Sequence, residues 1–391
     1  MLVAVGMCSS RFAFALATSI TFACSGPESS SGDPDGSTAA APDGAADAAA
    51  DEEWAIEVVD PAAVGGCMAA LALDSEGAGH IAYLYQLWDG NQWFDAELRY
   101  ADNTTGSWVT SVLETQEKRG YSPSIALSAG GAVHVSYLDW SSDSLRHLAR
   151  DGAGWVASTV DTAVQYYSEL AIDADGKEQL AYYRGHPSTG NLVHAVRDSA
   201  DWSRLVVDSE EGTGSFASMV LDREGAAHIA YYAISSKELR YATNASGQWK
   251  ITTVDSEGTT GFFTSIAVAD DGTCHIAYTG LSRALRHATN AGGAWATSVI
   301  DDGVDDIGDT AIGVDSQGRV HIAYMAHYPE WPDSELRHAT NRAGAWAVET
   351  VEVDSRTGSF PSLVVDGSVV HIAYCNDHRG QLRHAMLDLG Q

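Results

Sequence analysis

The sequence repeats itself, and this repeat restricts the possible folds more than any other feature. Its clearest element is the tetrapeptide His-Ile-Ala-Tyr, which recurs with small changes in seven copies spaced 45 to 54 residues apart. The copies begin at His80, His134, Gln179, His228, His275, His321 and His371. Repeats of this length are typical of solenoids and propellers, in which each repeat is one small structural unit.

Each repeat predicts four short β-strands. A strand of small residues, such as 69–74, leads through a tight turn to the strand that contains His-Ile-Ala-Tyr. A third strand has the pattern Leu-Arg-Tyr/His-Ala, and a fourth begins at a tryptophan. The tryptophans after residue 60 that begin fourth strands are Trp108, Trp155, Trp202, Trp249, Trp295 and Trp346.

The fourth strand is one copy short, and the N-terminal end of the repeat region supplies it. Residues 54–60, Trp-Ala-Ile-Glu-Val-Val-Asp, match residues 295–301, Trp-Ala-Thr-Ser-Val-Ile-Asp. A first strand that completes the last sheet closes a ring and protects the strand edges. We therefore predict an all-β protein with a seven-bladed β-propeller over residues 54–391. An open solenoid, the alternative, gives no reason for a lone strand at this position.

Two cysteines are expected to meet where the ring closes. Cys67 begins the first strand of blade one, and Cys375 follows the second strand of blade seven. These blades are neighbours, so an exported protein is predicted to join them by a disulfide. The alternative is two unrelated buried thiols. Cys274 has no evident partner.

Residues 1–24 resemble the signal of a bacterial lipoprotein, with a short apolar segment before Cys24. The resemblance implies that Cys24 is lipidated, and an ordinary cleaved signal is the alternative. Residues 25–53 contain small and acidic residues and no Lys or Arg, so a disordered spacer is expected. The protein is thus predicted to be secreted or held at the cell envelope, meeting the membrane only through a lipid anchor.

The charge of the chain excludes one class of partner. With a net charge of -31 it will not follow a phosphate backbone, so no nucleic acid is expected. No apolar run reaches the roughly 18 residues of a membrane span. The sequence contains no nucleophile elbow, zinc-finger spacing or phosphate-binding loop. No cofactor is therefore predicted, and the protein is expected to be a monomer.

The turns before the fourth-strand tryptophans resemble a known motif. The segment 242–249, Ala-Thr-Asn-Ala-Ser-Gly-Gln-Trp, resembles the Asp-box of sialidase-type, or BNR, propellers, with Asn in place of the box Asp and a shorter Gly-to-Trp spacing. The resemblance implies the fold and not the activity. In that family three arginines hold the substrate carboxylate, and the first of them lies on an innermost strand. Because no predicted innermost strand here contains arginine, sialidase activity is not expected.

The repeated histidine and arginine are interpreted as packing residues. Both faces of a blade are covered by its neighbours, so the histidine is expected to be neutral and hydrogen-bonded between blades. Gln179, which replaces it in blade three, supports this interpretation. The third-strand arginine, replaced only at Val193, is expected in ion pairs. A ring of equivalent sugar or anion sites is the alternative.

The connections between second and third strands break the repeat, and function is expected there. The longest is predicted at 84–97, and all four tryptophans outside the framework fall in these loops. With nearby tyrosines they predict a face that binds sugar rings, although the aromatics would also suit a simple cover over the channel mouth. The predicted ligand-binding residues are Tyr85, Trp88, Trp93, Trp140, Tyr166, Tyr167 and Trp331.

Two weaker hypotheses concern the same end of the ring. A histidine or tyrosine base beside an arginine would resemble the catalytic set of propeller polysaccharide lyases. The candidates are Arg184, His186, His327, Tyr328, His378 and Arg379. The acidic run 301–309 would hold Ca²⁺ through Asp302, Asp305, Asp306 and Asp309. It lacks the spacing of a known calcium loop, and a solvated loop is the alternative.

Three functions follow in order of preference. The first is a surface-tethered, non-catalytic propeller that binds a glycan or another extracellular ligand, such as a protein. The second is a polysaccharide lyase or glycoside hydrolase on the same face. The third is a structural or protein-interaction module of the cell envelope.

Overall fold

We analysed a computed structural model of the protein. It describes residues 53–62, 67–88, 93–114, 119–152, 154–186, 188–198, 201–328 and 333–390. The predicted signal, Cys24 and the spacer up to residue 52 lie outside these ranges. Residues Trp54–Gln391 form one compact unit. Within the described residues, no helix is long and apolar enough to cross a membrane.

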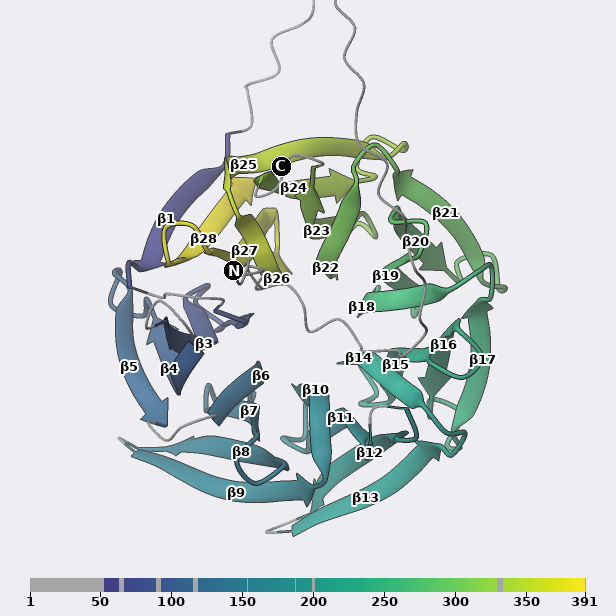
Figure 1. Ribbon diagram of the computed structural model, residues 1–391, viewed down its shortest axis with the longest axis horizontal. Helices are drawn as coiled ribbons and strands as arrows, with labels where there is room; N and C mark the ends of the chain where they lie inside the picture. The colour runs from purple at the N-terminus through teal and green to yellow at the C-terminus, as the bar shows by residue number, and fades with distance from the viewer. Residues whose placement is uncertain are drawn as a thin grey trace, which may run out of the picture. The chain divides into compact units, whose positions relative to one another are not determined.

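Seven four-stranded antiparallel sheets surround a common axis in this unit (Figure 1). Each sheet is one blade, and its strands run in sequence order from the axis outward in blades one to six. The predicted seven-bladed β-propeller is therefore confirmed.

The strands have the following limits. Blade one consists of β2 (Ala69–Leu73), β3 (Gly79–Trp88), β4 (Trp93–Asp102) and β5 (Val109–Glu114); blade two of β6 (Arg119–Leu127), β7 (Val133–Asp139), β8 (Ser144–Asp151) and β9 (Gly154–Thr162). Blade three consists of β10 (Val164–Ile172), β11 (Glu178–Arg184), β12 (Asn191–Asp198) and β13 (Asp201–Asp208); blade four of β14 (Thr213–Leu221), β15 (Ala227–Ala233), β16 (Glu238–Thr243) and β17 (Lys250–Asp255). Blade five consists of β18 (Thr260–Val268), β19 (Cys274–Gly280), β20 (Leu285–Thr289) and β21 (Ala296–Asp301); blade six of β22 (Asp306–Val314), β23 (Val320–His327), β24 (Asp333–Thr340) and β25 (Ala347–Ser355). Blade seven consists of β26 (Thr357–Asp366), β27 (Val369–Asn376), β28 (Gln381–Asp388) and β1 (Ala55–Asp60).

The ring closes through its N-terminal strand, as the sequence predicts. β1 pairs antiparallel with β28, with Ala55 opposite Met386, and forms the outer edge of blade seven. Cys67 and Cys375 form a disulfide across the same seam, with their Cα atoms 5.8 Å apart. The seam between blades seven and one is thus held by a sheet and by a covalent bond.

An aromatic pair packs each blade against the next. The tryptophan that precedes or begins each fourth strand lies edge-on against the third-strand ring of the preceding blade, at centroid distances of 5.1–5.6 Å. The pairs are Tyr100–Trp155, His147–Trp202, His194–Trp249, Tyr241–Trp295, His287–Trp346, His338–Trp54 and His384–Trp108. Seven such pairs, each stabilising by about 0.5–1.5 kcal/mol beyond the area buried, explain why the tryptophan repeats.

The repeated histidine hydrogen-bonds within its own blade. In blade five His275 Nδ1 lies 3.0 Å from His287 Nε2 on the neighbouring strand, and in blade six His321 lies 3.0 Å from His338. The predicted contact between blades is present in some copies, since Gln179 donates to the Gly225 carbonyl at 3.0 Å and His228 Nδ1 lies 3.4 Å from Cys274 Sγ. In blades five to seven the third-strand partner meets the next blade instead. Burial lowers the pKa of His275, so it is neutral near pH 7, as expected.

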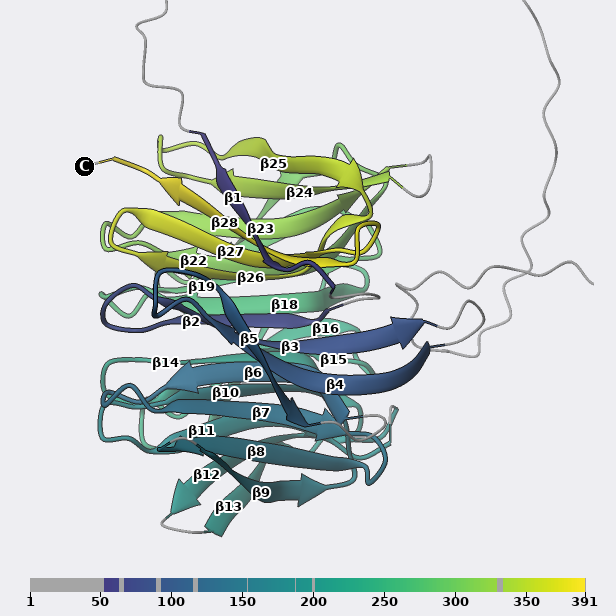
Figure 2. The same cartoon turned by 90° about the vertical axis from the view of Figure 1, so that its left-hand side faces the viewer.

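Several strands extend further than predicted. β3 continues to Trp88 and β4 begins at Trp93, so most of the predicted loop 84–97 is a long hairpin (Figure 2). The inner strands also begin early, as at Thr260 in β18, and so include Tyr121, Tyr166, Tyr167, Phe262 and Phe263. β6 begins at Arg119, so the statement that no innermost strand contains arginine was wrong. A register shift near the start of each of these strands breaks the alternation on which prediction depends.

Candidate functional site

A cavity of about 320 Å³ lies among the innermost strands of all seven blades. Equivalent residues of the seven strands form successive rings around it. The ring nearest the strand starts consists of Met68, Ser122, Tyr167, Phe216, Phe263, Asp309 and Phe360. Inner strands run antiparallel to the second strands, so this ring lies toward the end where second and third strands are joined. The volume of the cavity is at the lower end of the range for ligand pockets.

Four aromatic side chains contribute to this ring, here called the aromatic ring. The Phe216 ring centroid lies 5.0 Å from those of both Tyr167 and Phe263, and Phe360 lines the same cavity. Each of the four has a positive φ, which turns the strand at this point. Gly261, two residues before Phe263, makes the turn possible, since a Cβ there would lie 3.0 Å from the Leu239 Cα. The fold thus directs aromatic side chains toward the axis.

A second ring, two residues further along, connects the blades. Serine hydroxyls at this position accept a hydrogen bond from a backbone N–H of the next blade, for example Leu170 N to Ser124 Oγ at 3.0 Å. The others are Leu71 N to Ser362, Ile266 N to Ser218 and Ile312 N to Ser265, at 3.0–3.3 Å. In blade three Glu169 occupies the serine position and accepts a hydrogen bond from Ser124 at 2.9 Å.

Two carboxyl groups therefore line the cavity, and both are strongly perturbed. Burial raises the pKa of Glu169 from 4.5 to about 7, although the hydrogen bond from Ser124 opposes the shift. Burial likewise raises the pKa of Asp309 to about 6, although hydrogen bonds from the backbone N–H groups of Asp309 and Phe360 oppose the shift. A fraction of these groups is protonated near neutral pH, so the cavity presents both hydrogen-bond donors and acceptors.

Replacing Glu169 with glutamine is expected to stabilise the protein above pH 7. Because its folded pKa is raised, Glu169 favours folding below about pH 4.5, and this contribution is lost as pH rises through about 7. The whole pKa shift, from 4.5 to about 7, corresponds to about 3.4 kcal/mol of folding free energy. Since the side chain is partly exposed to the cavity, we expect the variant to gain about 2 kcal/mol at pH 8 and little at pH 5. Urea unfolding at both pH values measures this, and an equal effect at both would contradict it.

The predicted ligand-binding residues divide into three groups. Tyr167 lines the cavity. Trp140 is half-buried and stacked on Tyr121 at 4.2 Å, and Tyr85 lies under Arg99, whose Cζ is 3.4 Å from the ring centroid. These two therefore pack against the propeller instead of standing exposed. Trp331 and the side chains of Trp88, Trp93 and Tyr166 lie outside the described part.

The predicted catalytic candidates do not meet. Arg184 and His186 belong to blade three, whereas His327, Tyr328, His378 and Arg379 belong to blades six and seven across the ring (Figure 1). Tyr328 donates a hydrogen bond to Glu335 at 2.8 Å, and Arg379 pairs with Asp354. Arg184, His378 and Arg379 pair with a carboxylate of the preceding blade, at Asp161 or Asp354.

The acidic run 301–309 does not converge on a cation site within the described residues. Asp302 and Asp305 are exposed on the connection to β22 and Asp306 is exposed at the start of that strand, whereas Asp309 faces the cavity. None of them belongs to the one group of side chains whose donor atoms lie close enough to share a metal ion. The calcium hypothesis therefore has no geometric support.

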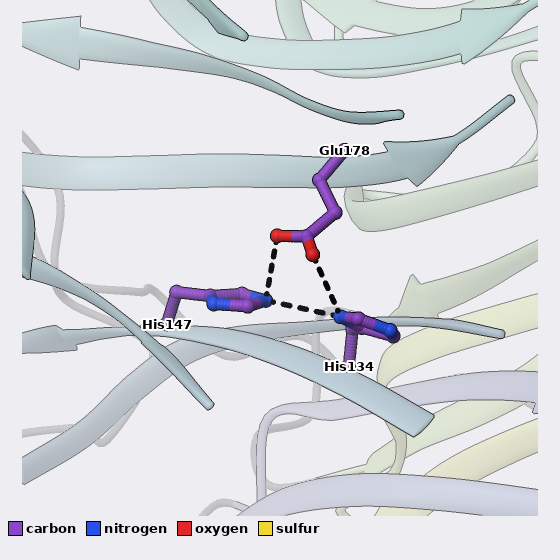
Figure 3. A group of neighbouring side chains, drawn as sticks. All are labelled: His134, His147 and Glu178. Atoms are coloured by element: carbon purple, nitrogen blue, oxygen red, sulfur yellow. Dashed lines mark hydrogen bonds and ion pairs between the residues drawn. The ribbon is translucent and has the colours of Figure 1, made fainter. Parts of the chain in front are cut away.

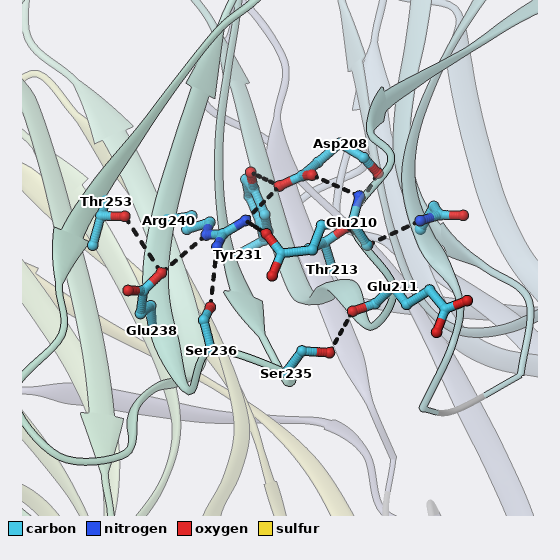
Figure 4. A network of polar contacts seen from close by, with 11 residues as sticks. Asp208, Glu210, Glu211, Thr213, Tyr231, Ser235, Ser236, Glu238, Arg240 and Thr253 are labelled. Carbon is cyan, nitrogen blue, oxygen red and sulfur yellow. Dashed lines mark hydrogen bonds and ion pairs between the residues drawn. The ribbon is translucent and has the colours of Figure 1, made fainter.

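The repeated arginine completes a contact between blades, here called the clasp (Figure 4). In the clasp of blades three and four, Asp208 accepts hydrogen bonds from Tyr231 at 2.8 Å and from Arg240 at 3.1 Å. The tyrosine of every blade donates in this way to the carboxylate at the end of the preceding outer strand. The other pairs are Tyr83–Asp60, Tyr137–Glu114, Tyr182–Asp161, Tyr278–Asp255, Tyr324–Asp301 and Tyr374–Glu352.

In blade three other arginines supply the positive charge of the clasp. Val193 replaces the repeated arginine there, and Arg184 and Arg204 instead approach Asp161, at 3.4 and 3.7 Å. The arginine is thus the partner of a buried carboxylate, as the ion-pair interpretation predicts. Its engagement leaves little support for the alternative of a ring of equivalent sugar sites.

Known proteins resemble this chain in structure but not in sequence. No protein-family model and no curated protein matches the sequence. The polysaccharide lyase Uly1 superimposes with a TM-score of 0.54 at 11% identity, over 82% of this chain and 90% of the lyase. A lectin of Aleuria aurantia in complex with Fucα1-6GlcNAc gives 0.52 at 13% identity, over 75% of this chain and 97% of the lectin.

The neighbours also include sialidases. The intramolecular trans-sialidase from Ruminococcus gnavus gives a TM-score of 0.43 at 12% identity, over 84% of this chain and 96% of the enzyme. No arginine is among the described residues that line the cavity. At these identities the likeness shows the fold alone: the chain is a seven-bladed β-propeller with fucose lectins and sialidases among its structural neighbours.

Proposed function

We propose that this protein is an exported glycan-binding propeller, tethered to the cell envelope through Cys24, that holds a sugar residue at the aromatic ring. The observation that carries the proposal is a cavity of ligand size with aromatic side chains at its mouth and two perturbed carboxyl groups behind them. Flat aromatic side chains suit the C–H faces of a sugar, and carboxyl groups suit its hydroxyl edges. Lectins and a polysaccharide lyase that share the fold support this choice.

Membrane fractionation of a Cys24→Ser variant tests the tether.

A glycan array probed with the full-length protein tests the binding site. Phe263→Ala is expected to weaken the binding of a glycan hit about 10-fold or more. The substitution removes an aromatic face that contributes about 1.4 kcal/mol to the binding free energy. Phe262→Ala is the matched control, since its ring does not line the cavity. It packs on Tyr232 at 4.7 Å and touches the aromatic ring only at Phe216, at 5.8 Å. The control variant should bind the same glycan as the unmodified protein. Absence of any hit, or equal losses in the two variants, would contradict the proposal.

One observation favours an enzyme as the second candidate. Glu169 and Asp309 share a cavity and have pKa values of about 7 and 6, which are suitable for a general acid. Release of reducing or unsaturated ends from a polysaccharide, lost in Glu169→Gln, would establish catalysis. Binding without any release across a broad panel would support the lectin.

A further inference from the structure

Three side chains meet between blades two and three at a place that the proposed function does not use. His134 Nδ1 and His147 Nε2 lie 3.3 Å apart, and both face the carboxylate of Glu178 (Figure 3). His134 Nδ1 is 3.3 Å from Glu178 Oε1, and His147 Nε2 is 3.2 Å from Glu178 Oε2. Two strands of blade two and one strand of blade three thus contribute one donor group each.

Glu178 is what distinguishes this interface from the other six. Histidine pairs are an ordinary part of the repeat and occur at His275–His287, His321–His338 and His371–His384, where no single carboxylate among the described residues faces both rings. Glu178 immediately precedes the second-strand motif. The equivalent residues in the other blades are Gly79, Val133, Ala227, Cys274, Val320 and Val370. Packing alone therefore does not require a carboxylate at this position.

The spacing of the three groups matches a metal ion. Zinc binds imidazole nitrogen and carboxylate oxygen at about 2.0–2.2 Å, so tetrahedral ligand atoms lie about 3.3 Å from one another. Two histidines and a glutamate are also a known zinc-binding set. We propose that His134, His147 and Glu178 bind a zinc ion, with water in the fourth position. Ser158 Oγ, 3.5 Å from the other nitrogen of His147, is placed to orient that ring.

Arg197 is the competitor for this site. Its Nη1 lies 3.0 Å from both oxygens of Glu178 and so neutralises the carboxylate when no cation is bound. Its Nε is buried with no hydrogen-bond partner, so that atom does not fix the guanidinium in place. Zinc would keep one carboxylate oxygen and leave the other to the arginine. Arg197 therefore lowers the affinity for zinc, which gives the proposal a second test.

Zinc titration of the full-length protein, after treatment with a chelator, tests the site. We expect one zinc ion per chain and a rise in melting temperature with zinc concentration. Glu178→Gln and His134→Gln should weaken binding by more than the roughly 10–100-fold cost of losing an outer-shell partner. Arg197→Met should strengthen it.

The control is His275→Gln in blade five, where Val320 stands in place of Glu178. It should bind zinc as the unmodified protein does. Near-ultraviolet circular dichroism of the metal-free variants confirms that each is folded. The proposal is wrong if the folded protein binds no zinc, or if Glu178→Gln binds it as tightly as His275→Gln.

Discussion

Replacing Cys67 and Cys375 together with alanine is expected to lower the free energy of unfolding by about 4 kcal/mol. The disulfide joins residues separated by 308 positions, so it closes a loop that contains almost the whole propeller. A long loop loses much conformational entropy when it is closed in the unfolded chain, and the crosslink removes that cost from folding. Both cysteines are also buried, so opening the bond leaves the contacts of a seam without their covalent support.

Denaturant unfolding of the oxidised protein and the variant measures this effect. Cys274→Ala is the matched control, because Cys274 is a buried free thiol within blade five. It removes one buried sulfur without removing a crosslink and is expected to cost about 1 kcal/mol. The ring itself should survive in the double variant, since β1 still pairs with β28. Equal losses for the control and the double variant would show that the crosslink adds nothing.

The ring could be predicted from sequence because its evidence is periodic. The phase of seven repeats located the missing strand at 54–60, and that phase also placed Cys67 and Cys375 at one seam. The starts of the inner strands could not be predicted in the same way. Each begins with a register shift and a residue at positive φ, such as Phe263, so neither alternation nor β-propensity marks it.

Apart from Tyr167, the residues of the candidate site were not predicted, although part of their signal was present. Phe216, Phe263 and Phe360 occupy one repeat position, two residues before a serine in each case. Glu169 stands at that serine position in blade three. An alignment of the repeats would therefore have shown a carboxylate where most other blades have a serine hydroxyl. What no alignment could show is that the axis remains open as a cavity. That depends on how seven blades of this width pack around one another.

The tryptophans outside the framework were predicted to form the binding face, and Trp140 does not fit that prediction. Trp140 was predicted to be exposed because it lies outside the framework, yet it stacks on Tyr121 against the core of blades two and three. The rings around the cavity are instead phenylalanine and tyrosine, on strands that the repeat had seemed to assign to packing. A residue that repeats can therefore serve a site when its repeat position faces the axis.

Asp208→Ala is expected to lower the free energy of unfolding by about 3 kcal/mol. Asp208 is buried and accepts hydrogen bonds from Tyr231, Arg240 and the backbone N–H of Glu210. Its loss leaves the Tyr231 hydroxyl, which is fully buried, without an acceptor and removes a charge opposite Arg240. Breaking a buried pair by removing one partner typically costs about 3–5 kcal/mol. We expect the lower end because Glu210 and Glu238 still pair with the arginine.

The control for this prediction is Glu210→Ala, which removes a carboxylate from the same arginine. Glu210 Oε2 lies 2.7 Å from Arg240 Nη1, closer than Asp208, but its side chain is 46% exposed. Water already solvates that carboxylate, so its removal should cost less than about 1 kcal/mol. Urea unfolding of both variants at pH 7 compares them directly. If Glu210→Ala costs as much as Asp208→Ala, the clasp stabilises the fold through its total charge. A larger cost for Asp208→Ala would instead show that the buried tyrosine and carboxylate of the blade interface provide the stability.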